Sequence, residues 1–167
     1  RVGVGIESGN QGILDRVHKG ITKDKAREMI RLAKEAGLRT AAFFIIGHPG
    51  ETRDTIRQTI AFARELNPTT VAFGVMVPYP GTEIAAMAAR GEGGYRLLSR
   101  DWSAYDKYFG GALEMADIPR RELDRWQARA YLSFYIRNRR LFSLARFLSS
   151  RRASVAHYLR RLLRRRA

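Results

Sequence analysis

The hydrophobic and polar positions of this chain alternate between short, purely apolar runs and longer segments with helical spacing. The apolar runs cover residues 2–6, 40–46 and 71–77. Short continuous apolar runs bounded by turn residues are typical of strands in a parallel sheet that is covered on both faces. We therefore predict three strands and expect the second and third to be buried on both sides.

The segments between these runs carry apolar residues at three- and four-residue spacing, which predicts helices. A threonine precedes three of them, Thr22, Thr52 and Thr82, and a shorter turn begins after Asn10. Threonine and asparagine are favoured as helix N-caps because their side chains accept hydrogen bonds from free backbone N–H groups. The expected inward positions are Ile13, Leu14, Val17, Ala26, Met29, Ile30, Ala33, Ala36, Ile56, Ile60, Ala63 and Leu66.

Three strand–loop–helix units in succession require parallel strands joined by right-handed crossovers. The fold class is therefore α/β, and two architectures fit: part of a parallel β/α (TIM-like) barrel or a doubly wound open sheet. In both, the loops at the carboxyl ends of the strands carry the chemistry. Here those loops are residues 7–9, 47–52 and 78–82, the glycine- and proline-rich segments of the chain.

The chain opens directly in an apolar strand, without a polar lead-in. We therefore expect residues 1–90 to be the C-terminal half of a larger β/α barrel, with part of the active site on polypeptide not contained here. None of the 167 residues is a cysteine, which excludes disulfides and thiolate-bound metal from this chain. No apolar stretch is long and pure enough to span a bilayer. The expected location is the cytoplasm, with peripheral contact at the inner face of the membrane as the alternative.

Helical periodicity is lost over residues 91–119 and returns over residues 120–167. We expect the first stretch to be an irregular connection whose aromatic residues pack on the main domain, and the second to be a basic helical extension. Of the net charge of +15, residues 1–119 account for little, with 16 Lys and Arg against 14 Asp and Glu, whereas residues 120–167 carry 15 Arg against two acids. The aromatic residues are Trp102, Tyr105, Tyr108 and Phe109, and the expected apolar faces of the extension are Leu123, Trp126, Ala130 and Phe134, then Leu141, Leu144, Ala145 and Leu148, then Val155, Leu159 and Leu162.

Three interpretations of this arginine-rich extension stay open. It can be a helical layer whose arginines are simply solvated and cover apolar surface with their stems. It can be an amphipathic segment that contacts an anionic membrane. It can bind nucleic acid, although no recognised nucleic-acid motif accompanies the arginines.

The first of the three loops places Glu7 and Ser8 between glycines at the carboxyl end of a strand. A carboxylate there can accept hydrogen bonds from both hydroxyls of a ribose, and the glycines let a bulky ligand approach the backbone. The alternative is structural, with either side chain capping the free N–H groups of the following turn.

The second and third loops also have two interpretations each. His48 is a candidate catalytic group, but Pro49 and Gly50 form a turn dipeptide that explains the segment without a ligand. In the third loop, the backbone of Val77 or Tyr79 could hydrogen-bond a purine edge, whereas two prolines favour a rigid turn. No metal site is predicted on this chain.

Taken in order, three motifs resemble those of the radical SAM superfamily, most closely the class with an N-terminal cobalamin (B12)-binding domain. They are Gly5-Ile6-Glu7-Ser8-Gly9, Phe44-Ile45-Ile46-Gly47-His48-Pro49-Gly50-Glu51-Thr52 and Pro78-Tyr79-Pro80-Gly81-Thr82. The resemblance covers roughly residues 1–90 and implies a partial β/α barrel, of which this chain would supply the C-terminal half.

By position, the resemblance implies that Glu7 binds the ribose hydroxyls of S-adenosylmethionine (SAM) and that Lys19 contacts its carboxylate. It implies that Ile46 and Gly47 pack on the adenine and that backbone around residues 77–79 recognises the adenine edge. The cofactor-binding positions so assigned are Glu7, Ser8, Lys19, Ile46, Gly47, Val77 and Tyr79.

The chemistry implied is reductive cleavage of SAM at a [4Fe-4S] cluster to a 5′-deoxyadenosyl radical. With cobalamin, the outcome is methyl transfer, ring rearrangement or cyclisation on a small-molecule or lipid-like substrate. Because the chain has no cysteine, the cluster ligands would lie in the missing N-terminal half, and the chain alone is expected to be inactive. The alternative function is a non-catalytic basic module whose arginine-rich tail binds anionic membrane or nucleic acid.

Overall fold

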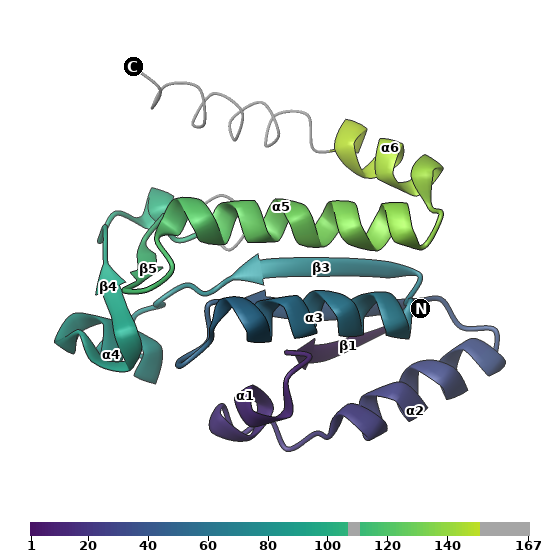
Figure 1. Ribbon diagram of the computed structural model, residues 1–167, viewed down its shortest axis with the longest axis horizontal. Coiled ribbons are helices and arrows are strands. Elements are labelled where there is room, and N and C mark those ends of the chain that lie inside the picture. The colour runs from purple at the N-terminus through teal and green to yellow at the C-terminus, as the bar shows by residue number, and fades with distance from the viewer. Residues whose placement is uncertain (107–110, 151–167) are drawn as a thin grey trace.

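A computed structural model describes residues 1–106 and 111–150 (Figure 1). Of the sequence predictions, those on Tyr108, Phe109 and residues 151–167 lie outside this described part. The elements in chain order are β1 (Val2–Glu7), α1 (Gln11–Arg16), α2 (Lys23–Glu35), β2 (Thr40–Ile46), α3 (Arg53–Leu66), β3 (Thr70–Val75), α4 (Glu83–Arg90), η1 (Glu92–Gly94), β4 (Tyr95–Leu97), η2 (Trp102–Ala104), β5 (Leu113–Met115), α5 (Arg120–Arg137) and α6 (Leu141–Ser150).

The three predicted strands form one parallel sheet in the order β1-β2-β3. Val4 pairs with Ala42, and Ala42 pairs in turn with Val71, so neighbouring strands start and end together. This arrangement confirms the α/β class and brings the carboxyl ends of all three strands to one edge. Closure into a barrel stays a prediction, because three strands form an open sheet.

The predicted N-caps are confirmed. Asn10 accepts a hydrogen bond from the N–H of Ile13, and Thr22, Thr52 and Thr82 each accept one from the backbone N–H three residues later. Each such cap is worth about 1 kcal/mol of helix stability. These local signals fix where the helices begin, and therefore how long the loops before them are.

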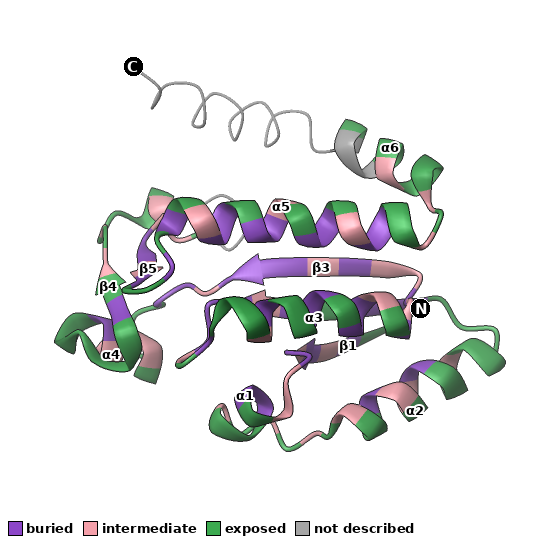
Figure 2. Ribbon diagram, viewed as in Figure 1, coloured by how far each residue is buried: buried purple, intermediate pink, exposed green. Residues whose placement is uncertain are grey.

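The sheet is buried on the face that carries Ile6, Phe44 and Phe73, where these side chains join the hydrophobic core. The expectation that β2 is covered on both faces is wrong for the described residues. Phe43 is 42% exposed between buried Ala42 and Phe44, because successive side chains of a strand point to opposite faces. In Figure 2, β3 is buried over most of its length, with intermediate residues near its start.

Helix α5 lies along the free edge of β3 rather than extending away from the sheet (Figure 1). The side-chain amide of Gln127 donates to the carbonyl oxygen of Phe73 (2.7 Å), and the Tyr131 hydroxyl accepts from the N–H of Phe73 (3.0 Å). These bonds satisfy backbone groups that an edge strand would otherwise leave unpaired. The apolar face predicted for this helix is buried, at Leu123, Trp126, Ala130 and Phe134. The division of the chain at residues 90 and 119 stays a prediction.

Helix α6 follows α5 after a short turn and contributes less to the core. Leu144 packs against the core, but Leu141 and Ala145 on the same predicted face are exposed. The side chain of Leu148 lies outside the described part, and of the other three residues expected on this face only Leu144 packs inward. Within residues 1–106 and 111–150, no helix combines the length and the apolar composition needed to cross a membrane.

The segment between α4 and α5 contains more regular secondary structure than its sequence predicted. Strands β4 and β5 form an antiparallel pair, and Tyr95 of β4 is buried in the core. Trp102, in contrast, is largely exposed and contacts the ring of Tyr105 at a centroid distance of 5.3 Å. The expectation that Trp102 packs on the main domain is therefore wrong.

Candidate active site

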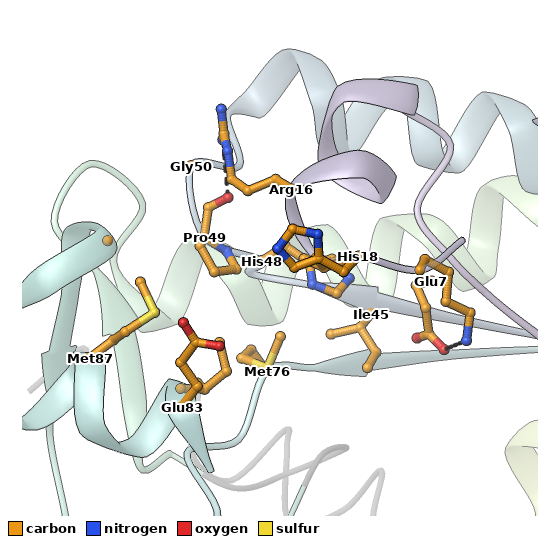
Figure 3. Close-up of a pocket in the computed structure, with 14 residues that line it drawn as sticks. Glu7, Arg16, His18, Ile45, His48, Pro49, Gly50, Met76, Glu83 and Met87 are labelled. Atoms are coloured by element: carbon orange, nitrogen blue, oxygen red, sulfur yellow. Dashed lines mark hydrogen bonds and ion pairs between the residues drawn. The ribbon is translucent and has the colours of Figure 1, made fainter. Parts of the chain in front are cut away.

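A cavity of about 800 Å³ lies at the carboxyl ends of the three parallel strands (Figure 3). The first two predicted loops contribute to its wall, as does helix α4, which follows the third loop. Figure 3 shows Glu7 on one side of the cavity and Met87 and Glu83 on the other. The residues that line it are Glu7, Arg16, Val17, His18, Lys19, Ile45, His48, Pro49, Gly50, Met76, Glu83, Ile84, Met87 and Gly93.

The polar side of the cavity is formed by an ion pair between Glu7 and Lys19. Their Oε1 and Nζ atoms are 3.0 Å apart, and the two side chains are 20% and 32% exposed. Glu7 ends β1 with a positive φ of 71°, where the register between β1 and β2 shifts. A Cβ on Gly5 would lie 2.8 Å from Glu7 Oε1 and 3.2 Å from Lys19 Nζ, so the absence of a side chain there lets the pair lie close against the strand. The pair is therefore held in place and yet open to a ligand.

Ser8, next to Glu7, has a different environment. It is fully buried, its Oγ lies 3.2 Å from Oγ1 of Thr59, and it accepts a hydrogen bond from the N–H of Asn10. A Cβ on Gly9 would lie 2.6 Å from the backbone of Thr59, which shows how closely this loop packs on α3. These contacts match the structural alternative for Ser8, and its predicted role with a cofactor stays a prediction.

The second loop is held by a buried carboxylate, Glu51. Its Oε2 accepts hydrogen bonds from the N–H groups of Gly47 (2.5 Å) and His48 (3.2 Å), and no described residue bonds its buried Oε1. The hydroxyl of Tyr95 donates to the carbonyl oxygen of Gly47 (2.7 Å) from the other side. Burial raises the pKa of Glu51 to about 7, although the two N–H donors oppose this shift.

His48 is 3% exposed, and neither ring nitrogen has a hydrogen-bond partner among the described residues. Burial lowers its pKa, and the carboxylate and backbone of Glu7 offset that effect only in part. Burial therefore favours the neutral form of the imidazole. An uncharged ring with two unused nitrogens in the wall of a cavity can bond a ligand or a water molecule there.

The structure does not bring all the predicted cofactor-binding residues to the cavity. Glu7 and Lys19 line it, whereas Ile46 is fully buried on the opposite face of the sheet. Ile45 faces the cavity instead, because neighbouring residues of a strand point in opposite directions. The backbone N–H and carbonyl of Gly47 are already bonded, to Glu51 and Tyr95.

The third loop makes its hydrogen bonds internally. The N–H of Tyr79 donates to Val77, and both the N–H and the hydroxyl of Thr82 donate to the carbonyl oxygen of Tyr79. The Tyr79 hydroxyl, at the surface, donates to the carbonyl oxygen of Tyr105. These contacts match the rigid-turn alternative, and the predicted contact of Val77 and Tyr79 with adenine stays a prediction.

Sequence reasoning missed several residues of the cavity wall. Met76 could have been found from the strand pairing. Gly74 pairs with Ile45, which faces the cavity, and Met76 follows Gly74 by two residues, so it points to the same side. Arg16 could not have been found, since its Nη1 reaches the carbonyl oxygen of Pro49 (3.2 Å) across 33 positions of sequence. Glu83 gives no signal of its own, because an acidic residue in the first turn of a helix is common for structural reasons.

The comparisons with known proteins cover the segment that contains the first two loops. Residues 1–63, which include the first two loops, match the family described as the Radical SAM superfamily. An uncharacterized methyltransferase of Pyrococcus horikoshii is 33% identical over 133 residues, which cover 80% of this chain and 28% of that protein. A protein of Methanocaldococcus jannaschii, provisionally named a methylthiotransferase, is 42% identical over 45 residues, which cover 27% of this chain and 10% of that protein.

The chain thus spans about a quarter or less of the length of these curated relatives. The family match includes the first two of the three motifs, and the names of both relatives describe transferases. Together they support the radical SAM superfamily, and they suggest an enzyme family whose members include methyl- and methylthiotransferase-like proteins.

Proposed function

We propose that this chain provides part of the SAM site of a radical SAM enzyme. The observation that carries the proposal is the Glu7–Lys19 pair, which lies at the carboxyl edge of the sheet within the segment that matches the family. SAM presents two neighbouring ribose hydroxyls and a carboxylate. A carboxylate and an ammonium group are the complementary partners for these groups.

The geometry of the pair fits such a ligand. Lys19 engages Oε1 of Glu7, and no described residue donates to the second oxygen, which leaves it to accept a hydroxyl. The φ of 71° at Glu7 is a sparsely populated conformation for a residue with a side chain. Strain of this kind is found where a binding site requires a particular side-chain direction.

The rest of the wall is suited to a purine and to an apolar substrate. Ile45, Met76 and Met87 provide apolar surface, and the flexible methionines adapt to ligands of different shape. Because burial favours the neutral form of His48, the ring does not repel the positive sulfonium of SAM. In this proposal Ile45 takes the adenine contact that the resemblance implied for Ile46.

The chain itself does not fit a [4Fe-4S] cluster. It has no cysteine, and its described residues contain no cluster of three or more His, Cys, Asp or Glu that could hold a metal ion. In the proposal, the cluster ligands therefore come from outside this chain, from a Cys-x-x-x-Cys-x-x-Cys loop encoded upstream. When bound together, SAM and the cluster supply a 5′-deoxyadenosyl radical, and the residues described here hold SAM and exclude water.

The names of the two relatives support group transfer as the reaction class. We propose methyl transfer first, with ring rearrangement or cyclisation as the second candidate. Cobalamin belongs to the proposal through the resemblance to the class with a cobalamin-binding domain, and no described residue is assigned to it.

SAM binding by the complete gene product tests the proposal. Glu7→Gln keeps the size of the side chain and removes its charge, so it should weaken SAM binding by about 10- to 100-fold, the loss of charge-assisted hydrogen bonds. Glu28→Gln, at an exposed surface ion pair, is the matched control and should leave SAM affinity unchanged. Isothermal titration calorimetry measures both, and equal affinities for the Glu7→Gln variant and the wild type would remove Glu7 from the site.

A further inference from the structure

The outer face of α5 carries an exposed stripe of cationic and apolar side chains. Arg125, Arg129, Leu132 and Ile136 follow one another at spacings of four, three and four residues, which places them on one side of the helix. Leu132 and Ile136 are 46% and 52% exposed. The stripe lies opposite the buried side of α5, which packs on β3, so no described element covers it.

The stripe borders a shallow groove of about 550 Å³. Arg125, Arg129 and Arg137 surround Leu132 and Ile136 in this groove, and none of the residues that line it is acidic. Elsewhere in the described part of the chain, many arginines form ion pairs, such as Arg53 with Glu122 and Arg90 with Glu92. No ion pair with a described residue occupies the three arginines of the groove, although Arg125 lies near Glu122 and Arg129 lies over the ring of Trp126 (5.1 Å). The groove thus combines positive charge with exposed aliphatic surface.

The apolar surface continues onto the start of α6. Leu141 is 63% exposed and Phe142 is 82% exposed, just beyond the end of α5, and the two helices contact each other. Figure 2 shows α6 exposed over most of its described length, next to the exposed bands of α5. Large side chains that are this exposed and this close together mark an interaction surface more often than isolated ones do.

We propose that this face, the outer side of α5 with the start of α6, docks on an anionic membrane surface. Arginines attract anionic lipid headgroups, while leucine, isoleucine and phenylalanine insert at the boundary between headgroups and acyl chains. The inference is independent of the proposed SAM site, which lies at the carboxyl edge of the sheet.

Charge and chemistry favour this occupant over three others. Residues 151–167 carry seven arginines and no acidic residue, so this segment would bring like charge to the groove. A second copy of the same face would do the same. A nucleic acid would pair with the arginines and could stack on Phe142, but it would leave the three aliphatic side chains, Leu132, Ile136 and Leu141, without a role.

Co-sedimentation of the complete gene product with vesicles tests the proposal. One set of vesicles contains phosphatidylglycerol and phosphatidylcholine, and the other contains phosphatidylcholine alone. We expect binding to the anionic set only. The double variants Arg125→Glu/Arg129→Glu and Leu132→Ser/Ile136→Ser should each reduce the partition coefficient at least about tenfold.

Matched controls separate this face from bulk properties. Arg39→Glu/Arg100→Glu has the same net charge as the first variant, and Leu32→Ser/Leu38→Ser removes two exposed leucines on and after α2. Both controls should bind vesicles like the wild type. Equal losses in a variant and its control would overturn the proposal, since binding would then depend on total charge or general hydrophobicity.

Two further measurements keep the other occupants testable. The first measures binding of a single-stranded oligonucleotide. If Arg125→Glu/Arg129→Glu no longer binds the oligonucleotide, while Leu132→Ser/Ile136→Ser still binds both the oligonucleotide and the anionic vesicles, nucleic acid is the partner and the proposal fails. If either variant converts a dimer into a monomer in size-exclusion chromatography, a second copy covers the face and the proposal fails.

A Phe142→Trp variant should show added fluorescence quenching by brominated lipid beyond that of the natural tryptophans, and no added quenching would exclude insertion.

Discussion

The loops after β1 and β2 each carry a glutamate beside the same cavity, and the two carboxylates have opposite roles. Glu7 is partly exposed and paired with Lys19 at 3.0 Å. Glu51 is buried, has no cationic partner among the described residues and binds two backbone N–H groups of its own loop. One carboxylate is open to the cavity, and the other holds the loop that shapes it.

This difference shows that residue type and position at a strand end do not by themselves identify a binding group. What separates Glu7 from Glu51 is whether the polar atoms are already used within the fold. Ser8 resembles Glu51 in this respect, because its hydroxyl is already bonded to Thr59 and Asn10.

The largest effect should come from Glu51→Ala. The substitution leaves the N–H groups of Gly47 and His48 buried without an acceptor, so it should lower the free energy of unfolding by about 2–4 kcal/mol. Urea denaturation followed by circular dichroism measures the loss. The exposed Glu28→Ala variant should unfold like the wild type, and a Glu51→Ala protein of wild-type stability would show that the loop does not depend on this carboxylate.

The pH dependence of stability should reveal the protonation of Glu51. Its pKa is about 7 in the fold and about 4.5 in the unfolded chain, so the fold favours the protonated form. Its contribution is present below pH 4.5 and is lost as the pH rises through 7, which lowers stability by about 2–3 kcal/mol between pH 5 and pH 8. Denaturation of the wild type and of Glu51→Gln at both pH values isolates the effect, because the amide does not titrate. An identical pH dependence in the two proteins would contradict the assignment.

Lys19→Gln should affect ligand binding more than folding. Its side chain is 32% exposed, and ion pairs within reach of solvent contribute little to stability, so the free energy of unfolding should fall by less than about 1 kcal/mol. SAM affinity should fall by about 3- to 10-fold, because a single charge-assisted contact is lost. Calorimetry with SAM and thermal unfolding give the two numbers, and the reverse ranking would place Lys19 with Glu51 as a structural residue.

The smallest effect on stability should come from His48→Gln. The contribution of His48 to the free energy of unfolding changes with pH in the opposite direction to that of Glu51. Burial lowers the pKa of His48 below that of the unfolded chain, so its contribution to stability is present above pH 6.5 and is lost as the pH falls through its lowered pKa. The wild type should therefore lose stability relative to His48→Gln on acidification below pH 6.5. If the two proteins show the same acid dependence, the imidazole is charged or solvated in the fold.

The sequence predicted the elements that depend on local signals. Thr22, Thr52 and Thr82 cap the expected helices, because capping involves residues only three positions apart. It failed where burial depends on distant partners. Phe43 lies in an apolar run and is exposed, because covering a strand face depends on what packs against it.

The same limit applies to the candidate site. Glu7 and Lys19 were identified from motif order, and the structure brings both to the cavity. The bond from Arg16 to Pro49 and that from Tyr95 to Gly47 join segments far apart in sequence, so no local pattern predicts them. Gln127 and Tyr131, which satisfy the edge of β3, looked like ordinary positions of a basic helix.

The most direct test of the central claim is a binding cycle between Glu7 and the ribose hydroxyls of SAM. The affinities of the wild type and of Glu7→Gln are measured for SAM and for its 2′,3′-dideoxy analogue, using the complete gene product. If Glu7 binds the hydroxyls, the wild type should prefer SAM by about 10- to 100-fold and the Glu7→Gln variant should lose most of that preference. An unchanged preference for SAM in the Glu7→Gln variant would contradict the claim that this carboxylate receives the ribose.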